Sequence, residues 1–568
     1  MRAGQLRWRR NRGAAAGALA LAATMAAVGL ATAVAGEETT SLLSRASGAT
    51  GAKGDGSSVF PSVSRDGRYV AFRSESRNLH PDDTDGRKDV FVRDRVENTT
   101  ILVSRADGPT GEKADGSSFN PRISADGRRV AFRSTADNLV PEDPGKGSDI
   151  YVRNLQTGKT TLISRATGAV GAKADGESFN PTISSDGRVI AFRSVATNLD
   201  PADTDTVEDI YVRDLNTDTT TLVSRASGPA GAKGNDVSTF PVISGDASLV
   251  AFRSESTNLH SDTSSGDRHI YARELASAKT ILVSRANGNS GKAGNANSTF
   301  ASVSKTGRYI AFDSLSDNLT PDDKDKSADV LLRDLTKNKT SLISRAGGFD
   351  GPKQNEGAAE PSISLNGRYI AFHATATNLD TAGADSASLD VFVRDTKIGR
   401  TLLISKGSGK KDANLTAEEP WISGDGTLVA FQSEATNLSK DDSDGIEDVF
   451  AREVAAIPRC FGRKATEMAA DGATTKASNR SDVIVGNPGA DKIKARKGKD
   501  RVCGGGGNDR LIGGPGGDRL SGEGGKDVLE GGKSSDRLRG GNGRDKLDGG
   551  KGNDKCTGGP GRNKELSC

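Results

Sequence analysis

The sequence contains few aromatic residues, histidines and cysteines. Aromatic side chains make up 4% of its 568 residues, whereas glycine occurs 70 times, and there are only four histidines and four cysteines. So few large apolar side chains, with so much glycine, argue against a helical enzyme core and favour many short elements joined by tight turns. The length also makes one average core improbable, so we expect two or more modules.

Common catalytic motifs are missing as well. The chain has no Gly-x-Ser-x-Gly, no complete Gly-x-x-x-x-Gly-Lys-Ser/Thr phosphate loop and no His-Glu-x-x-His. The four histidines are His80, His260, His269 and His373. These absences favour a protein that is not an enzyme. Hydrolase or lyase chemistry that uses calcium and carboxylates stays open, because it needs little sequence signature.

A single long apolar stretch occurs, and it lies at the N-terminus. Residues 1–35 hold five arginines and no acidic residue, followed by an alanine-rich stretch that ends in Ala33-Val34-Ala35. This order is typical of an export signal with a small-x-small cleavage site. We expect cleavage after Ala35 and an extracellular protein without stable membrane insertion. The alternative is an uncleaved anchor, since the stretch is long enough to span a bilayer.

All cysteines lie in the last 109 residues, at Cys460, Cys503, Cys556 and Cys568. An even number in an exported chain indicates two disulfides, for which three pairings are possible. Spacing favours Cys460 with Cys503 and Cys556 with Cys568, each closing one end of the same small domain.

The middle of the chain repeats every sixty residues. The sequence Pro-x-(Ile/Val)-Ser, or a close variant, begins at Pro61, Pro121, Pro181, Pro241, Ala301, Pro361 and Pro420. Each copy continues through a turn, usually with glycine, into an apolar strand such as 69–74, and two further strands follow, such as 89–94 and 100–105. Four short strands in each of seven copies, without helical periodicity, predict an all-β fold: a seven-bladed β-propeller over residues 36–457.

The two ends of this region complement each other. Residues 40–45 have the sequence of a fourth strand but precede the first copy, and the seventh copy stops after its third strand, 448–452. We therefore expect the N-terminal strand to complete the last blade, which leaves no open blade edge.

The repeat resembles a known family. Residues 64–72, with the sequence Ser-Arg-Asp-Gly-Arg-Tyr-Val-Ala-Phe, followed by Asp-Val-Phe-Val-Arg-Asp at 89–94, are similar to the TolB-type, WD40-like propeller repeat. The resemblance covers about residues 39–455. It implies the fold and leaves the function open, because such propellers serve binding proteins as well as enzymes.

One propeller face carries long loops and acidic loops. Strand alternation places the loop between strands two and three on the same face as the long blade-to-blade loops. The extra loop length on this face indicates a recognition surface. On this face, Asp-x-Asp-Gly-x-x-Asp resembles a compact calcium loop. It consists of Asp83, Asp85 and Asp89 in blade one and of Asp442, Asp444 and Asp448 in blade seven. Alternatively, these residues form polar turns whose last aspartate bonds local backbone. Blades three and five lack the glycine and favour the polar turn.

Arginine recurs on two strands of the repeat. It stands at 73, 133, 193 and 253 on the second strand, and at 93, 153, 213, 333 and 394 on the third. We expect these arginines to pair with carboxylates of the blades. Asp313, His373 and Gln432 replace arginine on the second strand, and this departure suggests an asymmetric pocket.

The C-terminal segment repeats every nine residues. Aspartate returns at each ninth position from Asp482 to Asp554, with an apolar residue or cysteine two positions later. The pattern Gly-Gly-x-Gly-x-Asp-x-Leu resembles the hemolysin-type (RTX) calcium repeat, a parallel β-roll, here over residues 481–568 after a linker at 458–480. The resemblance implies Ca²⁺ as cofactor, with Asp509, Asp518, Asp527, Asp536, Asp545 and Asp554 as ligands.

Some copies depart from this pattern. The glycine pairs are missing or broken before Asp482, Asp491 and Asp500, and Glu523 and Ser534 each replace a glycine. One apolar side chain per nine residues buries too little surface to offset the ordering entropy of a glycine-rich chain. Calcium can supply the missing stabilisation, because carboxylates and carbonyl groups are its preferred ligands.

Together these features predict an exported calcium-binding protein, expected to be a monomer, whose propeller binds an extracellular protein or glycan. The alternative is a secreted calcium-dependent hydrolase or lyase with its site on the long-loop face. Nucleic acid is not an expected partner, because the basic C-terminal segment lacks aromatic side chains on which bases could stack.

Overall fold

The structure is a computed structural model that describes residues 39–143, 145, 147–263, 266–379, 388–407, 412–470 and 474–568. The predicted export signal lies outside these residues. Within them the chain forms strands and turns but no helix, so no membrane-spanning helix is found there. The all-β prediction is therefore confirmed.

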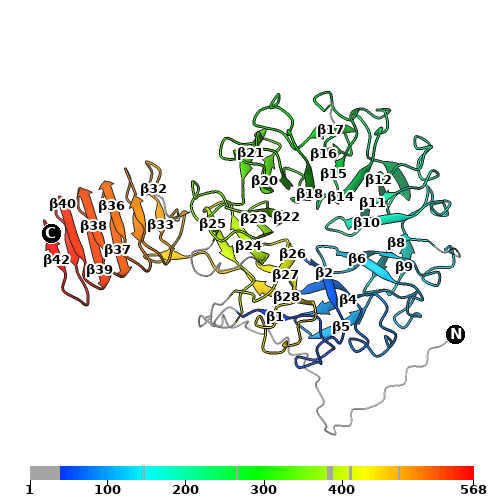
Figure 1. Cartoon of the computed structure of the whole chain (residues 1–568), viewed down its shortest axis with the longest axis horizontal. Coiled ribbons are helices and arrows are strands. Elements are labelled where there is room, and N and C mark those ends of the chain that lie inside the picture. The colour runs from blue at the N-terminus through cyan, green and yellow to red at the C-terminus, as the bar shows by residue number, and fades with distance from the viewer. Residues whose placement is uncertain are drawn as a thin grey trace, which may run out of the picture. The chain divides into compact units, whose positions relative to one another are not determined.

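Seven four-stranded antiparallel sheets are arranged radially (Figure 1). Blade 1 comprises β2 (Ser58–Val63), β3 (Tyr69–Ser74), β4 (Asp89–Asp94) and β5 (Thr99–Leu102). Blade 2 comprises β6 (Ser118–Ile123), β7 (Arg129–Ser134), β8 (Asp149–Asn154) and β9 (Thr160–Leu162). Blade 3 comprises β10 (Ser178–Ile183), β11 (Val189–Ser194), β12 (Asp209–Asp214) and β13 (Thr219–Leu222). Blade 4 comprises β14 (Ser238–Ile243), β15 (Leu249–Ser254), β16 (His269–Glu274) and β17 (Lys279–Leu282).

The remaining blades follow the same order. Blade 5 comprises β18 (Ser298–Val303), β19 (Tyr309–Ser314), β20 (Asp329–Asp334) and β21 (Lys339–Leu342). Blade 6 comprises β22 (Ala358–Ile363), β23 (Tyr369–Ala374), β24 (Asp390–Asp395) and β25 (Arg400–Leu403). Blade 7 comprises β26 (Ala417–Ile422), β27 (Leu428–Ser433), β28 (Asp448–Glu453) and, as its fourth strand, β1 (Ser41–Leu42). The predicted closure is confirmed, because Ser41 pairs with Ala451 and Leu42 with Phe450.

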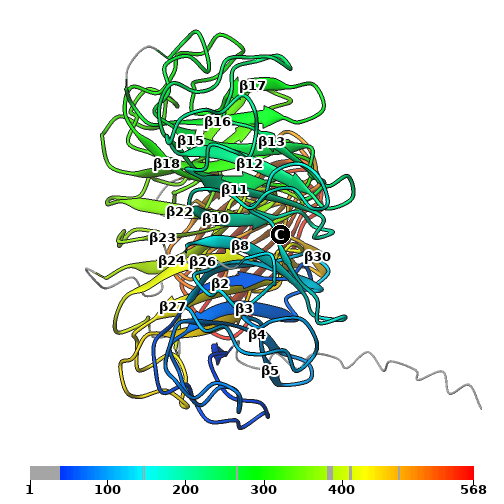
Figure 2. The ribbon, with the colours of Figure 1, turned by 90° about the vertical axis from the view of Figure 1, so that its right-hand side faces the viewer.

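The first strand of each blade faces the propeller axis. In the side view, β2, β10 and β22 lie near the middle, whereas β5 and β17 lie toward the edges (Figure 2). The Ser62 hydroxyl of blade 1 accepts a hydrogen bond of 3.1 Å from the Ile123 amide of blade 2, which ties neighbouring first strands together. Apolar side chains of the second and third strands, such as Phe72 and Phe91, are fully buried between blades. The propeller core is therefore a set of layers between adjacent sheets.

The C-terminal segment forms two parallel six-stranded sheets. One contains β31 (Glu467–Met468), β33 (Val483–Val485), β35 (Arg501–Cys503), β37 (Arg519–Gly524), β39 (Arg537–Asn542) and β41 (Lys555–Thr557). The other contains β32 (Thr474–Lys476), β34 (Lys492–Lys494), β36 (Arg510–Pro515), β38 (Val528–Lys533), β40 (Lys546–Lys551) and β42 (Lys564–Leu566). Leucines at nine-residue spacing, from Leu511 to Leu547, fill the narrow space between the sheets. The predicted β-roll is confirmed.

The roll begins earlier than predicted. Strands β31 and β32 open its two sheets, yet both lie within 458–480, the segment expected to be a linker. Before them, β29 (Arg459–Cys460) and β30 (Arg463–Lys464) form a short hairpin. The nine-residue pattern missed these strands because they lack the Asp-x-Leu signature. Disulfides join Cys460 to Cys503 and Cys556 to Cys568, the pairing that spacing favoured.

Candidate functional site

Successive nine-residue repeats contribute alternately to the two sheets of the roll, so its aspartates form two rows. One row contains Asp491, Asp509, Asp527 and Asp545, and the other contains Asp482, Asp500, Asp518, Asp536 and Asp554. Within a row, residues 18 positions apart are neighbours, about 4.8 Å apart along the stack of strands. Each row therefore brings several carboxylates close together.

Each of these carboxylates uses one oxygen within the fold. Asp527 Oδ1 accepts a hydrogen bond of 2.8 Å from the Asp509 amide, and Asp536 Oδ1 accepts one of 2.8 Å from the Asp518 amide. The other oxygen, Oδ2, is buried and has no hydrogen-bond partner among the described residues in seven aspartates: Asp500, Asp509, Asp518, Asp527, Asp536, Asp545 and Asp554. An unpaired buried carboxylate oxygen is costly, which indicates that a cation belongs beside it.

Burial and neighbouring carboxylates disfavour the charged form of these groups. Burial, together with a smaller contribution from neighbouring carboxylates of the same row, raises the pKa of Asp509 and Asp536 to about 6 and that of Asp518 to about 7. At neutral pH the ionised form of these carboxylates is therefore unfavourable unless a cation lies beside them.

Glycine creates the space beside each Oδ2 atom. A Cβ atom on Gly522 would lie 2.2 Å from Asp527 Oδ2 and 2.5 Å from the Gly540 carbonyl oxygen. Gly513 has the same relation to Asp518 and to the Gly531 carbonyl, at 2.6 and 2.7 Å. A carboxylate and a carbonyl from the next coil thus border one small space that only glycine leaves open. Hard oxygen ligands of this kind fit Ca²⁺.

The first aspartates of the rows differ from the rest. Asp482 Oδ2 accepts hydrogen bonds from the Ser478 amide and hydroxyl, and Asp491 Oδ2 accepts one from the Asn487 amide. These two carboxylates are satisfied by local groups. Asp500 keeps an unpartnered Oδ2 although Ala495 stands where later repeats have glycine. Glycine spacing alone left Asp500 out of the predicted ligand set, whereas the nine-residue aspartate register includes it.

Ser534 occupies a strained backbone position in this array. Its φ is 89°, whereas the equivalent residues Gly516 and Gly543 have φ of 144° and 139°. Positive φ costs a non-glycine residue about 1 kcal/mol or more. We expect Ser534→Gly to stabilise the calcium-loaded roll by about 1 kcal/mol, measured by denaturant unfolding. The matched control is Ser535→Gly, where φ is not positive and glycine should be neutral or destabilising. Equal effects of the two changes would contradict this reading.

The acidic loops of the propeller do bring their carboxylates together. Asp83, Asp85 and Asp89 have ligand atoms within 4.8 Å of one another, as do Asp442, Asp444 and Asp448. A lysine from the adjacent inter-blade loop lies among each set. Lys113 Nζ is 3.4, 2.9 and 2.8 Å from Asp83, Asp85 and Asp89, and Lys53 Nζ is 3.6, 2.9 and 2.6 Å from the other three. Lysine therefore supplies the positive charge that calcium would supply in a calcium loop.

The same pairing holds in blades 3 and 5, through Lys233 and Lys353. Blade 4 has Thr263 and His269 at the equivalent of the first and third aspartates, and Ala293 stands where the other loops have lysine. Where the acidic set is absent, the lysine is absent too. This joint loss is the sequence signal that favours an ion-paired cluster over a calcium loop.

The repeated arginines do not mainly pair with blade carboxylates, contrary to expectation. Arg93 donates to the carbonyls of Ala46 and Gly48, at 2.9 and 3.0 Å, and so anchors the inter-blade loop. Second-strand arginines instead lie over phenylalanine rings, as Arg73 does over Phe60 at 5.0 Å. A guanidinium has several donors and can therefore bind two loop carbonyl groups at once.

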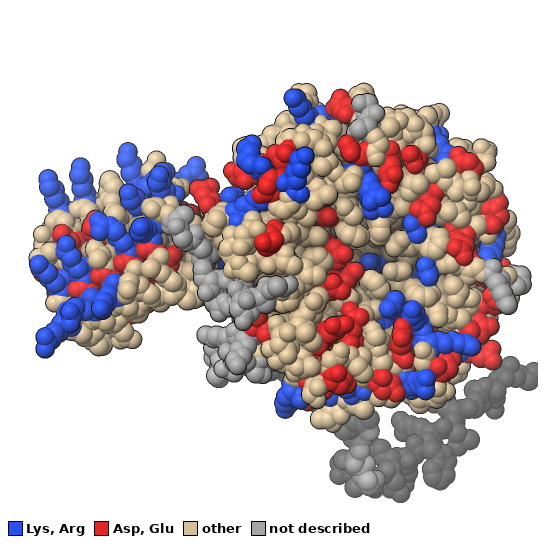
Figure 3. All heavy atoms as spheres, viewed as in Figure 1, with Lys and Arg blue, Asp and Glu red and all other residues tan. Residues whose placement is uncertain are grey.

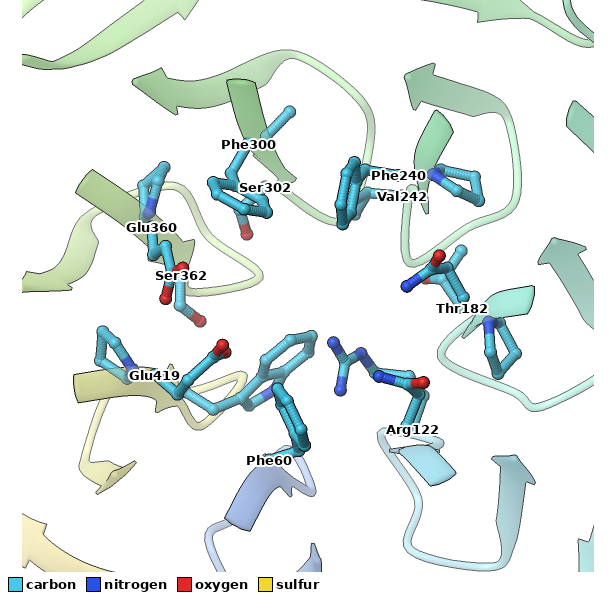
Figure 4. A pocket seen from close by; sticks show the side chains of 18 residues that line it. Phe60, Arg122, Thr182, Phe240, Val242, Phe300, Ser302, Glu360, Ser362 and Glu419 are labelled. Atoms are coloured by element: carbon cyan, nitrogen blue, oxygen red, sulfur yellow. The ribbon is translucent and has the colours of Figure 1, made fainter. Parts of the chain in front are cut away.

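A pocket lies on the propeller axis, lined by the first strands of the blades (Figure 4). It holds about 880 Å³ of empty space, its open mouth included. The residue before each Pro-x-(Ile/Val)-Ser lines it, and a β-bulge occurs at this point in every blade. These residues are Phe60, Asn120, Asn180, Phe240, Phe300, Glu360 and Glu419. All except Phe300 have φ between 47° and 57°. Bulges redirect side chains, here toward the axis.

The pocket lacks the sevenfold regularity of the blades. Arg122 lines the pocket in blade 2 and Trp421 lines it in blade 7, and the two glutamates come from blades 6 and 7. The residues that replace arginine on the second strand, Asp313, His373 and Gln432, lie next to these seven lining residues. Asp313 Oδ1 accepts a hydrogen bond of 2.7 Å from the Phe300 amide, and Gln432 Oε1 accepts one of 2.9 Å from the Phe60 amide. Figure 3 shows acidic groups along one side of the central hollow, toward blades 6 and 7.

Comparison with solved structures finds other propellers. An oligogalacturonate lyase in complex with manganese is 14% identical, with 73% of this chain and 97% of that chain covered and a TM-score of 0.44. TolB from Acinetobacter baumannii is 15% identical, with 63% and 65% covered and a TM-score of 0.32. The propeller domain of the Trilobed protease from Pyrococcus furiosus is 14% identical, with 70% and 92% covered and a TM-score of 0.39.

A search of curated proteins gives no significant match. The family model of the RTX calcium-binding nonapeptide repeat (4 copies) matches this chain four times, with overlap, at residues 477–511, 504–536, 512–545 and 530–564. The match covers the rows of aspartates and their glycines, and RTX nonapeptide repeats bind Ca²⁺. The C-terminal segment of this chain is thus an array of RTX calcium-binding repeats.

Proposed function

We propose that the chain is an exported calcium-binding protein whose propeller is a binding module for an extracellular protein or glycan. Calcium is held in the roll by the seven aspartates with an unpartnered oxygen, Asp500 and the six predicted from the repeat. The recognition site is the axial pocket of the propeller. The observation that carries this assignment is the lining of that pocket, which differs from blade to blade although the blades are otherwise alike.

The enzymatic alternative is less well supported. It placed a calcium-dependent hydrolase or lyase site on the face with the long loops. Lysines neutralise the acidic loops there, so the described loops of that face offer no evident place for the calcium that such chemistry needs. A binding site needs only complementary shape and charge, which a pocket of mixed apolar and charged lining provides.

Two experiments test the proposal. Expression of the full chain in a bacterial host, followed by N-terminal sequencing of the exported product, should give a chain that begins at Gly36. Immobilised extracellular glycans and surface proteins are then probed with wild-type protein and with Trp421→Ala, in calcium. We expect retention of a specific partner by the wild type and at least tenfold weaker retention by the variant. Cleavage of the immobilised glycans, or equal retention by both proteins, would contradict the proposal.

A further inference from the structure

The axial pocket contains one carboxylate more than it contains cations. Its charged lining residues are Arg122, Glu360 and Glu419. The Arg122 guanidinium lies 4.4 Å above the Trp421 ring. Burial raises the pKa of Glu419, and the charge of Arg122 opposes this rise by favouring the ionised carboxylate. Glu419 thus has a cation in the pocket, and Glu360 does not. Figure 4 shows Glu360 and Glu419 on one side of the pocket and Arg122 across from them.

No group in the described part of the chain compensates Glu360. Its Oε2 atom is buried without a hydrogen-bond partner, and the nearest basic atom is His373 Nδ1 at 3.7 Å, itself buried and unpartnered. Burial lowers the pKa of His373 to about 4, so the imidazole is neutral at physiological pH. The other charged groups that act on Glu360 are Glu419, Glu418 and Asp313, which are all acidic.

The backbone at Glu360 is also strained. Its φ is 52°, and blades 2 and 3 place Asn120 and Asn180 in the same conformation, with φ of 48° and 47°. Asparagine tolerates this region, whereas glutamate is strained there by about 1 kcal/mol or more. Glu360 is thus partly buried and unpaired at a strained position of the bulge, and the asparagines of blades 2 and 3 show that the bulge itself does not require a carboxylate. Such a residue indicates function.

The rest of the lining determines which cation fits. Phe240 and Phe300 meet edge to face, with ring centroids 5.0 Å apart, and Phe60 and Trp421 line the same pocket. Aromatic faces attract organic cations and provide no oxygen ligands. Calcium needs six to eight oxygen ligands that converge on one point. Among the described residues, the groups of three or more side chains that could hold a metal ion all lie in the acidic loops, and none lies at this pocket.

We infer that the axial pocket binds a monovalent organic cation, either an alkylammonium group or a basic side chain of a partner. Glu360 is its counter-ion, and Phe240, Phe300 and Trp421 contact its alkyl portion. The inference rests on the proposed function in that it takes this pocket as the recognition site, and it adds the chemical class of the ligand.

Trp421 makes the inference directly testable. The sequence has two tryptophans, Trp8 and Trp421, so the full chain with Trp8→Phe reports the pocket through fluorescence. This protein is titrated with n-pentylammonium, with the neutral n-pentanol and with the anion pentanoate, which share one alkyl chain. We expect saturable quenching by pentylammonium at millimolar or lower concentration, and at least tenfold weaker binding of the other two.

Variants of Glu360 locate the effect. Glu360→Gln should weaken pentylammonium binding at least tenfold, and Glu434→Gln, at an exposed site outside the pocket, should leave it unchanged. Glu360→Asn supplies the residue that blades 2 and 3 already use at this position. It should fold at least as stably as the wild type, measured by thermal unfolding, and still lose binding. Equal binding of all three probes, no saturable binding, or full binding by both Glu360 variants would overturn the inference.

The pH dependence adds an independent readout. Burial and the acidic neighbours raise the pKa of Glu360 to about 8. The ammonium group binds the ionised carboxylate, so its apparent affinity should rise about tenfold between pH 7 and pH 9. Flat pH dependence would contradict the role of Glu360. If pentylammonium fails to bind while partner retention still depends on Trp421, the ligand class is wrong and the proposed function stands.

Discussion

Removal of calcium from the full chain should unfold the C-terminal roll and leave the propeller folded. Seven carboxylates in two rows have a buried oxygen without a partner in the described chain, and the leucine core between the sheets is narrow. Without calcium, the repulsion within each row is uncompensated. At a calcium concentration 1,000 times the Kd, bound calcium stabilises the fold by about 4 kcal/mol per independent site.

Hydrogen exchange on the full chain is the appropriate measurement, because it separates the two regions. We expect amide protection across 501–551 to fall by about 1,000-fold in a calcium chelator, in line with that stabilisation. Protection in the blades should not change. Asp518→Asn should weaken calcium binding, whereas Asp548→Asn, outside the rows, should not. A roll that keeps its protection without calcium, or two variants that behave alike, would refute the assignment of these ligands.

The same carboxylates give the calcium-free roll an unusual pH dependence. Burial raises the pKa of Asp500, Asp509 and Asp536 from 3.8 to about 6, and that of Asp518 to about 7. The folded state then binds more protons than the unfolded state between about pH 4 and pH 7, so its free energy of unfolding falls as pH rises through this window. We expect chelator-treated roll to be more stable at pH 4 than at pH 8, by circular dichroism. Calcium-loaded roll should show the opposite order, because protons compete for its ligands.

Sequence periodicity predicted the architecture well because each repeat is a local unit. The sixty-residue spacing gives the blade count, and the nine-residue spacing places every aspartate of the rows. What it could not predict is where separate repeats meet. Lys113, in the loop that leads to the next blade, neutralises aspartates that lie up to about thirty positions earlier in a different loop, so a loop read by itself resembles a calcium site.

The residues that line the pocket escaped prediction for a related reason. The residues before Pro-x-(Ile/Val)-Ser vary from phenylalanine to asparagine to glutamate, and strand alternation does not show which way they point. A β-bulge in the backbone turns these residues toward the axis, and the pattern of side chains along the strand does not reveal the bulge. The replacement of arginine by Asp313, His373 and Gln432 indicated the blades on which the pocket is asymmetric, because these residues lie against residues that line it. They identified the asymmetry without identifying Glu360.

The acidic loops provide the second large expected effect. Lys113→Met should destabilise the propeller by about 3 to 5 kcal/mol, because removal of one partner leaves buried charges uncompensated. Asp83 and Asp89 are fully buried, and Lys113 Nζ contacts both. Burial already raises the pKa of Asp89 to about 6 even with the lysine present. The loss is measured as the shift in the propeller's denaturant midpoint, in a calcium chelator.

The same variant decides between the two readings of this loop. Once Lys113 is removed, three carboxylates and Gly86 remain in an Asp-x-Asp-Gly-x-x-Asp loop, and calcium should restore part of the lost stability. Calcium should not change the stability of the wild-type blade, where lysine already provides the charge. Lys88→Met is the control: the side chain of this lysine is 40% exposed and lies 3.6 Å from Glu75, so its loss should cost less than about 1 kcal/mol. If Lys113→Met is as mild as Lys88→Met, the lysine is incidental to the stability of the blade. If calcium stabilises the wild-type blade, the loop is a calcium site.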